Sequence, residues 1–323
     1  MFNCRSGLIK VVLTSLLALA FNSPALGGKD SDDDTKANPK LGSAPAVLWR
    51  EPVDIKTRDL FYGQGGARHQ PKGKFTFIGE KLNGVNPKFD VRDDSGIRWG
   101  VKMGEEAKPE TAATRLIWAV GYFANEDYYL PELTVSGDLT LTRGQTLIRD
   151  DKVRKGVRLK RHNKGEHQVG DWSWDKNPFV GTKELDGLKI MMEIICNTDL
   201  KTVQQHVYDV RGKEQRYIAA DVGASFGKAG QGFLRSKGKL SDYEKLPLIK
   251  NAGPDYIDFW HFKRIPRDHA IWIGQYLTQL SDDQLHDAFR AGGFSPEEIE
   301  GFSRKVREKI NELVNLRGTT SRL

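Results

Sequence analysis

The sequence predicts an α+β chain with a strand-rich N-terminal half and a helix-rich C-terminal half. Three observations predict it. Between residues 75 and 103 apolar and polar residues alternate, which is the period of a strand with one buried face. From residue 183 apolar residues recur at helical spacing, and segments beyond residue 265 repeat that pattern. At 323 residues the chain is long enough to form two lobes with a shared cleft.

The strand pattern is clearest around two turn signals. Asn83-Gly84 is a strong signal for a two-residue hairpin, and "DDSG" at 93–96 predicts a second turn. In the segment "IRWGVKM" that follows, apolar and polar residues alternate, so a strand there buries one face and points Lys102 off the other. Similar alternation predicts further strands in 128–144 and 156–179.

Start and stop signals predict where two helices lie. Pro109 suits the first position of one helix, Glu110 its positive end, and Gly121 is a stop signal. Thr182 can cap a second helix over residues 183–195. The order of elements is therefore strands, a helix, more strands, and then a largely helical region.

The N-terminus has the composition of a secretory signal peptide over residues 1–27. A basic start precedes an apolar run that is too short to span a membrane, and Ala25 and Gly27 suit a cut after Gly27. We therefore expect an exported chain, periplasmic or secreted. Residues 28–46 are expected to form a disordered linker. The remaining parts are predicted as a β-rich N-lobe at 47–180, an α-rich C-lobe at 181–316 and a frayed tail at 317–323.

The composition is that of a globular protein with a mild positive charge. Apolar residues make up 38% and charged residues 29% of the chain, and the formal net charge is +7. That charge suits an anionic small ligand or a membrane surface, and no nucleic acid is expected as a partner. Cys196 is the only cysteine after the signal peptide, and a small buried hydrophobe is its simplest interpretation. A reactive thiol would need a neighbouring base that the sequence does not identify.

Three short motifs carry the functional argument. "WGVK" places Lys102 on a strand, "DLKTVQ" begins at Asp199, and "DVGASFG" begins 22 residues later at Asp221. A lysine fixed on a strand can offset the charge of phosphate groups. One aspartate can take a proton from a hydroxyl group, and another can hold Mg²⁺. Taken alone, each motif also fits a solvated lysine or an ordinary turn. Only the occurrence of all three motifs in this order along the chain indicates a phosphate-binding site.

In this order the motifs resemble those of the protein kinase family, and more closely its atypical, secreted and HipA-like members. The segments "NTDLK" and "DVGASFG" are also similar to segments of uncharacterised exported bacterial proteins. The resemblance covers about residues 75–316 and implies a bilobal protein-kinase-like fold. It further implies ATP with Mg²⁺ in the cleft, and phosphate transfer to an acceptor that is a protein, a sugar or a lipid.

The resemblance implies three nucleotide-binding positions in the N-lobe. Lys102 corresponds to the lysine that holds the α- and β-phosphates, and Gly100 to the small residue beneath the adenine. Glu110 is the candidate for the helix glutamate that pairs with this lysine, with Glu105 and Glu106 as competitors. A second interpretation of Glu110 is that it stabilises the helix dipole.

The two later motifs imply the catalytic and metal-binding positions. Asp199 corresponds to the base that takes or orients the proton of the attacking hydroxyl, and Lys201 to the group that neutralises the γ-phosphate. Asp221 corresponds to the aspartate that binds Mg²⁺, with Gln204 as its expected second ligand.

Departures from the family pattern leave turnover open. Gln204 stands where the family has a metal-binding asparagine, and Asn197-Thr198 stand where it has His-Arg. No G-x-G-x-x-G is present, so either the Asn83-Gly84 turn serves or "GQGG" at 63–66 folds over the phosphates. An ordinary linker turn is the simpler interpretation of "GQGG". The alternatives are a catalytically inactive pseudokinase that acts as a binding or scaffold module, and an envelope-binding protein with no nucleotide.

Two further segments have competing interpretations. The basic segment 152–164 predicts either weak contact with an anionic surface or an ordinary solvated face. Trp172 and Trp174 alternate as strand residues do, which favours core packing over stacking on a ligand.

Overall fold

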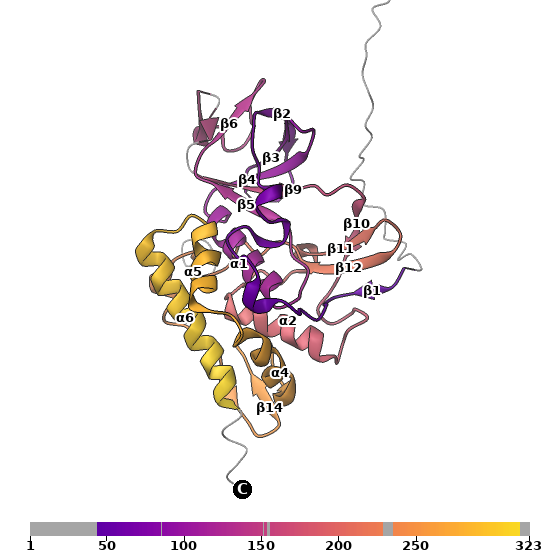
Figure 1. Ribbon diagram of the computed structural model, residues 1–323, viewed down its shortest axis with the longest axis vertical. Coiled ribbons are helices and arrows are strands. Elements are labelled where there is room, and N and C mark those ends of the chain that lie inside the picture. Colours follow the sequence, from indigo (N-terminus) through magenta and orange to yellow (C-terminus); the bar gives the residue numbers. More distant parts are fainter. Residues whose placement is uncertain (1–43, 85, 151, 154–155, 229–234, 317–323) are drawn as a thin grey trace, which may run out of the picture. The chain divides into compact units, whose positions relative to one another are not determined.

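The structure is a computed structural model that describes residues 44–84, 86–150, 152–153, 156–228 and 235–316 (Figure 1). The predicted signal peptide, most of the predicted linker and the predicted tail lie outside the described residues. The linker prediction ends one residue too late, because Ala46 already belongs to strand β1 (Ala46–Val47). Among the described residues, no helix has both the length and the apolar composition needed to cross a membrane.

The largest sheet has eight strands in the order β5-β9-β4-β3-β2-β6-β8-β7. This sheet confirms predicted strands between residues 75 and 161. Residues 137–144 and 172–179 are also predicted as strand, but they form no strand beyond an isolated bridge between Ser173 and Lys176. The hairpin prediction is wrong in length, because six residues separate the strands that flank Gly84, whose φ of 70° favours glycine. The strands are β2 (Phe75–Lys81), β3 (Lys88–Asp93), β4 (Arg98–Met103), β5 (Asp127–Leu130), β6 (Leu133–Ser136), β7 (Ile148–Arg149), β8 (Lys152–Val153) and β9 (Val157–Arg161).

The two faces of this sheet differ in chemistry, as the alternation predicts. Phe89, Val91, Trp99 and Val101 are at most 1% exposed and form a hydrophobic core on one face. The polar residues between them, including Lys102, lie on the other face because successive strand residues point to opposite sides. The polar face therefore carries the predicted nucleotide-binding residues.

Helix α1 (Ala107–Ala119) follows β4 and joins two parts of the fold. It packs against α5 and also against β5 and β9 (Figure 1). The helix begins two residues before Pro109, so the prediction that Pro109 occupies its first position is wrong. Gly121 lies just past its end with a φ of 98°, a conformation that favours glycine, as the stop signal predicted.

The C-terminal half contains a second hydrophobic core and most of the helices. Thr182 caps α2 as predicted, because its side chain accepts a hydrogen bond from the N–H of Leu185. Trp172 and Trp174 are buried in this core, which confirms their predicted packing role. The helices are α2 (Lys183–Ile194), α3 (Leu240–Tyr243), α4 (Arg267–Leu277), α5 (Asp282–Ala291) and α6 (Pro296–Asn315).

A second sheet has four strands in the order β1-β12-β11-β10. Apolar residues of this sheet belong to the same hydrophobic core as those of the helices. Its strands β10 (Glu166–Asp171), β11 (Gln205–Val210) and β12 (Glu214–Ala219) are antiparallel, and β1 joins β12 in parallel. The start of the predicted N-lobe at residue 47 thus pairs with a strand of the predicted C-lobe. A small sheet contains β13 (Asn251–Ala252), β14 (Tyr256–Asp258) and β15 (Ile265–Pro266).

Candidate active site

Lys102 lies at the centre of a buried group of charges. It is 2% exposed, and its ammonium contacts three carboxylates. The distances from Nζ are 2.7 Å to Glu110 Oε2, 2.9 Å to Asp221 Oδ1 and 3.1 Å to Glu106 Oε2. Lys102 is therefore not a solvated surface lysine. Its contact with Asp221 joins two parts of the sequence that are 119 residues apart.

Helix α1 supplies two of these carboxylates. Glu106 is the N-cap residue of α1, and Glu110 lies one turn further along the helix. Glu110 also accepts a hydrogen bond from Arg158 of β9 at 2.9 Å, so pairing with cations explains it better than a dipole effect alone. Of the three glutamates considered as partners of Lys102, both Glu106 and Glu110 contact it.

The charges of the group shift one another's protonation. Burial alone would lower the pKa of Lys102, but the charges of Glu110, Asp221 and Glu106 more than offset it and raise this pKa. Burial would raise the pKa of Asp221, yet the Lys102 charge and hydrogen bond hold it well below its usual range. The pKa of Glu106 is lowered in the same way, against burial, chiefly by Lys102. All three groups are therefore ionised at neutral pH.

A second group of predicted site residues surrounds Asp199. Lys201 lies 3.2 Å from its Oδ1, and the side-chain amide of Gln204 donates to its Oδ2 at 3.4 Å. The Arg235 guanidinium is 3.9 Å from Oδ2. Lys201 is otherwise exposed, so it is available to a ligand at the surface of the site.

The backbone of Gln204 connects the two groups. Gln204 ends a short 3₁₀ helix at Thr202–Gln204, and its carbonyl accepts hydrogen bonds from the N–H groups of Ala220 and Asp221 at 3.0 and 3.2 Å. The two sequence motifs are therefore adjacent at the end of the β11–β12 hairpin. The Gln204 side chain, however, is turned toward Asp199.

Gly100 lies on the same strand face as Lys102, two residues away. A Cβ atom built on it would be 3.4 Å from His162 Nε2 and 3.5 Å from Asp90 Oδ1, which is ordinary contact distance. The surface beside Gly100 is thus polar. Burial and the nearby Lys160 charge lower the pKa of His162 to about 3, so this imidazole is neutral.

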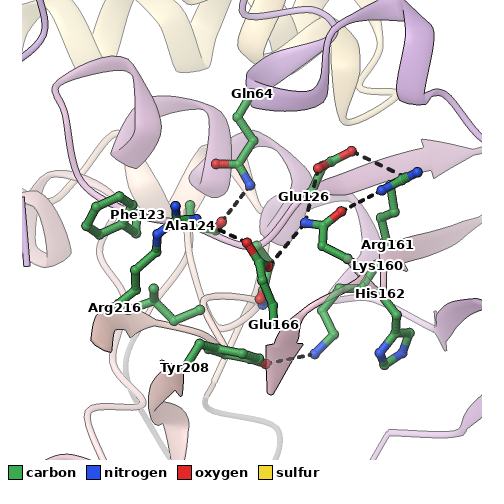
Figure 2. A pocket seen from close by; sticks show the side chains of 13 residues that line it. Gln64, Phe123, Ala124, Glu126, Lys160, Arg161, His162, Glu166, Tyr208 and Arg216 are labelled. Carbon is green, nitrogen blue, oxygen red and sulfur yellow. Dashed lines mark hydrogen bonds and ion pairs between the residues drawn. The ribbon is translucent and has the colours of Figure 1, made fainter. Parts of the chain in front are cut away.

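A small pocket lies beside this strand face, as Figure 2 shows. Lys160, which is opposite Gly100 in the sheet, reaches toward the Tyr208 hydroxyl at 3.4 Å. The cavity is about 60 Å³, room for roughly two water molecules, which is well below the volume of ordinary ligand pockets. In this state it does not accommodate a nucleobase. Its lining also includes Gln64, Phe123, Glu126, Glu166 and Arg216.

The sequence interpretation missed two cations that follow the second motif. Lys237 contacts Glu106, and Arg235 lies near Asp199 as described. Backbone hydrogen bonds from Gly238 to Ser225 and from Lys239 to Phe226 hold this segment beside the "ASFG" stretch. The sequence of this segment, "RSKGK" at 235–239, is visibly basic. No local sequence pattern, however, indicates that the segment lies next to Lys102 and Asp199.

The structure shows the surroundings of two segments with competing interpretations. In "GQGG", Gly63 packs against Arg115, and Gly65 packs against Glu126. In the basic segment 152–164, Arg158 is 6% exposed and pairs with Glu110. Arg161 donates to Asn163. Arg158 and Arg161 therefore interact with groups of the protein itself, and contact of the segment with an anionic surface stays a prediction.

Cys196 is buried, as its simplest interpretation predicted. It has an unexpected neighbour, since the ammonium of Lys309 lies 2.9 Å from its Sγ. Lys309 is itself fully buried and also donates to the carbonyls of Glu193 and Ile194 at the end of α2.

The order of parts and their contacts define the class of fold. A strand lysine paired with a helix glutamate meets the aspartate of an Asp-x-Gly turn, and an Asp-x-Lys loop lies directly before the hairpin that leads to that turn. The chain therefore has the bilobal, protein-kinase-like α+β fold that the motifs predicted.

No protein-family model and no curated protein matches the sequence. Among solved structures, the chain is similar to the proinflammatory kinase CtkA of Helicobacter pylori, with a TM-score of 0.49 and 10% identity over 78% of this chain and 99% of that one. It is also similar to the Golgi casein kinase, with a TM-score of 0.41 and 9% identity over 78% and 73% of the two chains. The same kinase with Mn/ADP bound has a TM-score of 0.42 and 9% identity over 77% and 74%.

Proposed function

We propose that this chain is an exported kinase-like protein that binds a nucleotide with Mg²⁺ and transfers phosphate to an acceptor. The observation that carries the proposal is the contact of Lys102 with both Glu110 and Asp221. A buried lysine held by two carboxylates from different parts of the chain is costly to build unless its position is used. The acceptor is a hydroxyl group of a protein, a sugar or a lipid.

The donor set at Asp221 fits Mg²⁺. This ion prefers oxygen ligands, and the carboxylates of Asp221, Glu106 and Glu110 have oxygen atoms within 4.8 Å of one another. Lys102 contacts Asp221 through Oδ1, the Asp221 side chain is 24% exposed, and its second oxygen is the one that could face a ligand. Asp221 would hold the ion from that oxygen, and Mg²⁺ would neutralise charge on the phosphates. Gln204 would have to turn its side chain away from Asp199 to act as the second ligand.

The remaining residues have roles that follow from their positions. Lys102 would hold phosphate oxygens, and the paired Glu110 keeps its ammonium in place. Asp199 would orient or take the proton of the acceptor hydroxyl, and the exposed Lys201 would stabilise the transferred group.

A pseudokinase is the second candidate, and one observation favours it. The Gln204 amide donates to Asp199, the residue that would act as the base. This contact occupies an oxygen of Asp199 and keeps Gln204 away from the metal position. A chain locked in this arrangement would bind nucleotide without transferring phosphate.

Nucleotide binding is tested by thermal unfolding of the chain without residues 1–27. With Mg²⁺ and ATP at about 1,000 times Kd, the expected stabilisation is about 4 kcal/mol. We expect Asp221→Asn to lose the Mg²⁺-dependent part of this stabilisation, because the amide cannot replace the ionised ligand. The control Asp138→Asn makes the same chemical change on an exposed loop and should behave as the wild type. No stabilisation of the wild-type chain by ATP, ADP or GTP would refute both candidate functions.

Turnover is tested with Asp199→Asn. If the chain is an active kinase, the variant should still be stabilised by Mg²⁺ and ATP, while phosphate transfer falls by about 100-fold or more because the proton acceptor is lost. Radiolabelled phosphate transfer to protein, sugar and lipid fractions measures this activity. Binding without wild-type transfer to any acceptor or to water would favour the pseudokinase.

The export part of the proposal rests on the first 27 residues alone. Its test is the intact mass of the chain recovered outside the cytoplasm, which should begin at Gly28. Retention of the full sequence in the cytoplasm would refute it.

A further inference from the structure

Four cations lie in a row across the polar face of the large sheet. Lys81, Lys88, Lys102 and Arg158 are directly opposite one another on β2, β3, β4 and β9. Residues that are directly opposite share a face of the sheet, with Cα atoms about 4.5–5.5 Å apart. Like charges in such positions repel each other. A row of this kind therefore requires anions close by.

Three members of the row have such anions. Lys81 lies 3.2 Å from Asp90, and Arg158 lies 2.9 Å from Glu110. Lys102 has its three carboxylates. Lys88 differs, because among the described residues it has no ion pair and no side-chain hydrogen bond.

The position of Lys88 directs its charge toward the candidate active site. Its side chain is half-buried, and its Nζ lies 3.3 Å from where a Cβ would sit on Gly84, in the turn between β2 and β3. Burial, and then the neighbouring Lys102 charge, lower the pKa of Lys88, while the Asp221 charge opposes this shift. The Lys88 charge in turn helps to keep the pKa of Asp221 low. Lys88 thus belongs electrostatically to the group around Lys102 and Asp221, without a counter-ion of its own.

An oligophosphate matches this arrangement. Each phosphate group of such a chain carries negative charge, so two lysines on adjacent strands can each meet a different group. A lysine ammonium binds phosphate as a compact point charge and needs no fixed geometry. The chain also has no glycine-rich phosphate-binding motif at the β2–β3 turn, so another group must supply that contact.

We propose that Lys88 is a second phosphate-binding lysine, which together with Lys102 holds the oligophosphate chain of a nucleotide beneath the β2–β3 turn. This inference rests on the proposed function and extends it to a residue and a contact. In this proposal the Lys88 side chain makes the phosphate contact that a glycine-rich loop would otherwise make.

The test compares Lys88→Met with Lys74→Met, which makes the same change at an exposed position before β2. Calorimetric titration of the chain without residues 1–27 measures Kd for Mg²⁺-ATP and for inorganic tripolyphosphate. We expect Lys88→Met to weaken both by about tenfold, which is the loss of one charge-assisted contact. Lys74→Met should stay within about twofold of the wild type, and Lys88→Arg should recover most of the affinity because it keeps the charge.

A purely structural role for Lys88 predicts a different result. Because Lys88 has no ion pair or side-chain hydrogen bond among the described residues, the melting temperature of unliganded Lys88→Met should equal or exceed that of the wild type. A lower melting temperature together with unchanged Kd values would overturn the inference. Should Lys88→Met fail to fold, Lys88→Gln serves for the same titration.

The outcomes separate this inference from the proposed function. Equal Mg²⁺-ATP affinity of wild type and Lys88→Met overturns the inference and leaves nucleotide binding intact. Tripolyphosphate binding that depends on Lys88, without any nucleotide binding, supports the inference and overturns the proposed function. If the wild type binds neither compound, both are overturned.

Discussion

At the scale of single residues, the site is a balanced set of buried charges. Lys102, Arg158 and Lys237 are the cations, and Glu106, Glu110 and Asp221 are their carboxylate partners. A buried charge is stable only when it is paired and hydrogen-bonded. Lys102 has three carboxylate partners, but it is the only ion-pair partner of Asp221 among the described residues, so the loss of Lys102 would leave Asp221 unpaired there. Pairing with three carboxylates explains why Lys102 stays ionised at 2% exposure.

Asp127 is the exception among the buried carboxylates. It is fully buried, neither of its oxygens has a hydrogen bond, and Arg158 is 3.7 Å away. Burial raises its pKa to about 6 in spite of Arg158. The folded state therefore binds this proton more tightly than the unfolded state, whose pKa is near 3.8. The stability from this proton is complete below pH 3.8 and is lost as pH rises through 6.

We predict that Asp127→Asn removes this loss. Relative to the wild type, the variant should gain free energy of unfolding between pH 4 and 7, by about 3 kcal/mol for a pKa near 6 against 3.8. Urea unfolding at a series of pH values measures the difference, with Asp138→Asn as the exposed control. Parallel curves for the wild type and Asp127→Asn would contradict the assigned pKa.

At the scale of elements, helix α6 holds the end of α2 in place. Lys309 of α6 donates to the carbonyls of Glu193 and Ile194, which lie at the C-terminus of α2 and lack partners within that helix. A cation there also favours the negative end of the helix dipole. The chain continues from the end of α2 into the loop that contains Asp199. By holding the end of α2, the Lys309 contact therefore helps to hold the start of this loop.

We therefore predict that Lys309→Met destabilises the chain by about 2 kcal/mol, because two charge-assisted hydrogen bonds to buried carbonyls are lost. The Cys196 N–H and the Tyr243 hydroxyl still donate to the carbonyls of Glu193 and Ile194, so neither is left without a donor. Urea unfolding measures the effect. Lys305→Met, one turn earlier on α6, is the matched control and should cost less than about 1 kcal/mol, since its partner Glu308 is exposed. Equal losses for the two variants would show that the contacts of Lys309 with α2 contribute nothing specific.

At the scale of the whole molecule, the site lies where two hydrophobic cores meet. One core lies under the eight-stranded sheet and the other among the helices and the four-stranded sheet. Helix α1 contributes apolar residues to the second core and Glu110 to the polar face of the first sheet. A motion of one part against the other would therefore move Glu110 and Asp221 relative to Lys102.

The sequence predicted the types and order of the elements well, because alternation, helical spacing and capping residues act locally. Thr182, Gly121 and the alternation through Lys102 are of this kind. Its errors at Pro109 and at the Asn83-Gly84 turn concern boundaries, where local signals compete with packing. The order of the motifs also pointed to Lys102 and Asp221 as neighbours, and their side chains lie 2.9 Å apart. Their roles in a site stay predictions.

Other features were decided only by the tertiary structure. The choice of both Glu106 and Glu110, the return of Lys237 to the site and the contact of Gln204 with Asp199 depend on residues brought together from distant segments. The row that contains Lys88 depends on the register of four strands, and a shift of one residue would turn that lysine to the other face. Local periodicity by itself determined which residues form strands and helices. Only the pairing of those elements determined which charges meet, because charge interactions depend on distance in space and not on spacing in sequence.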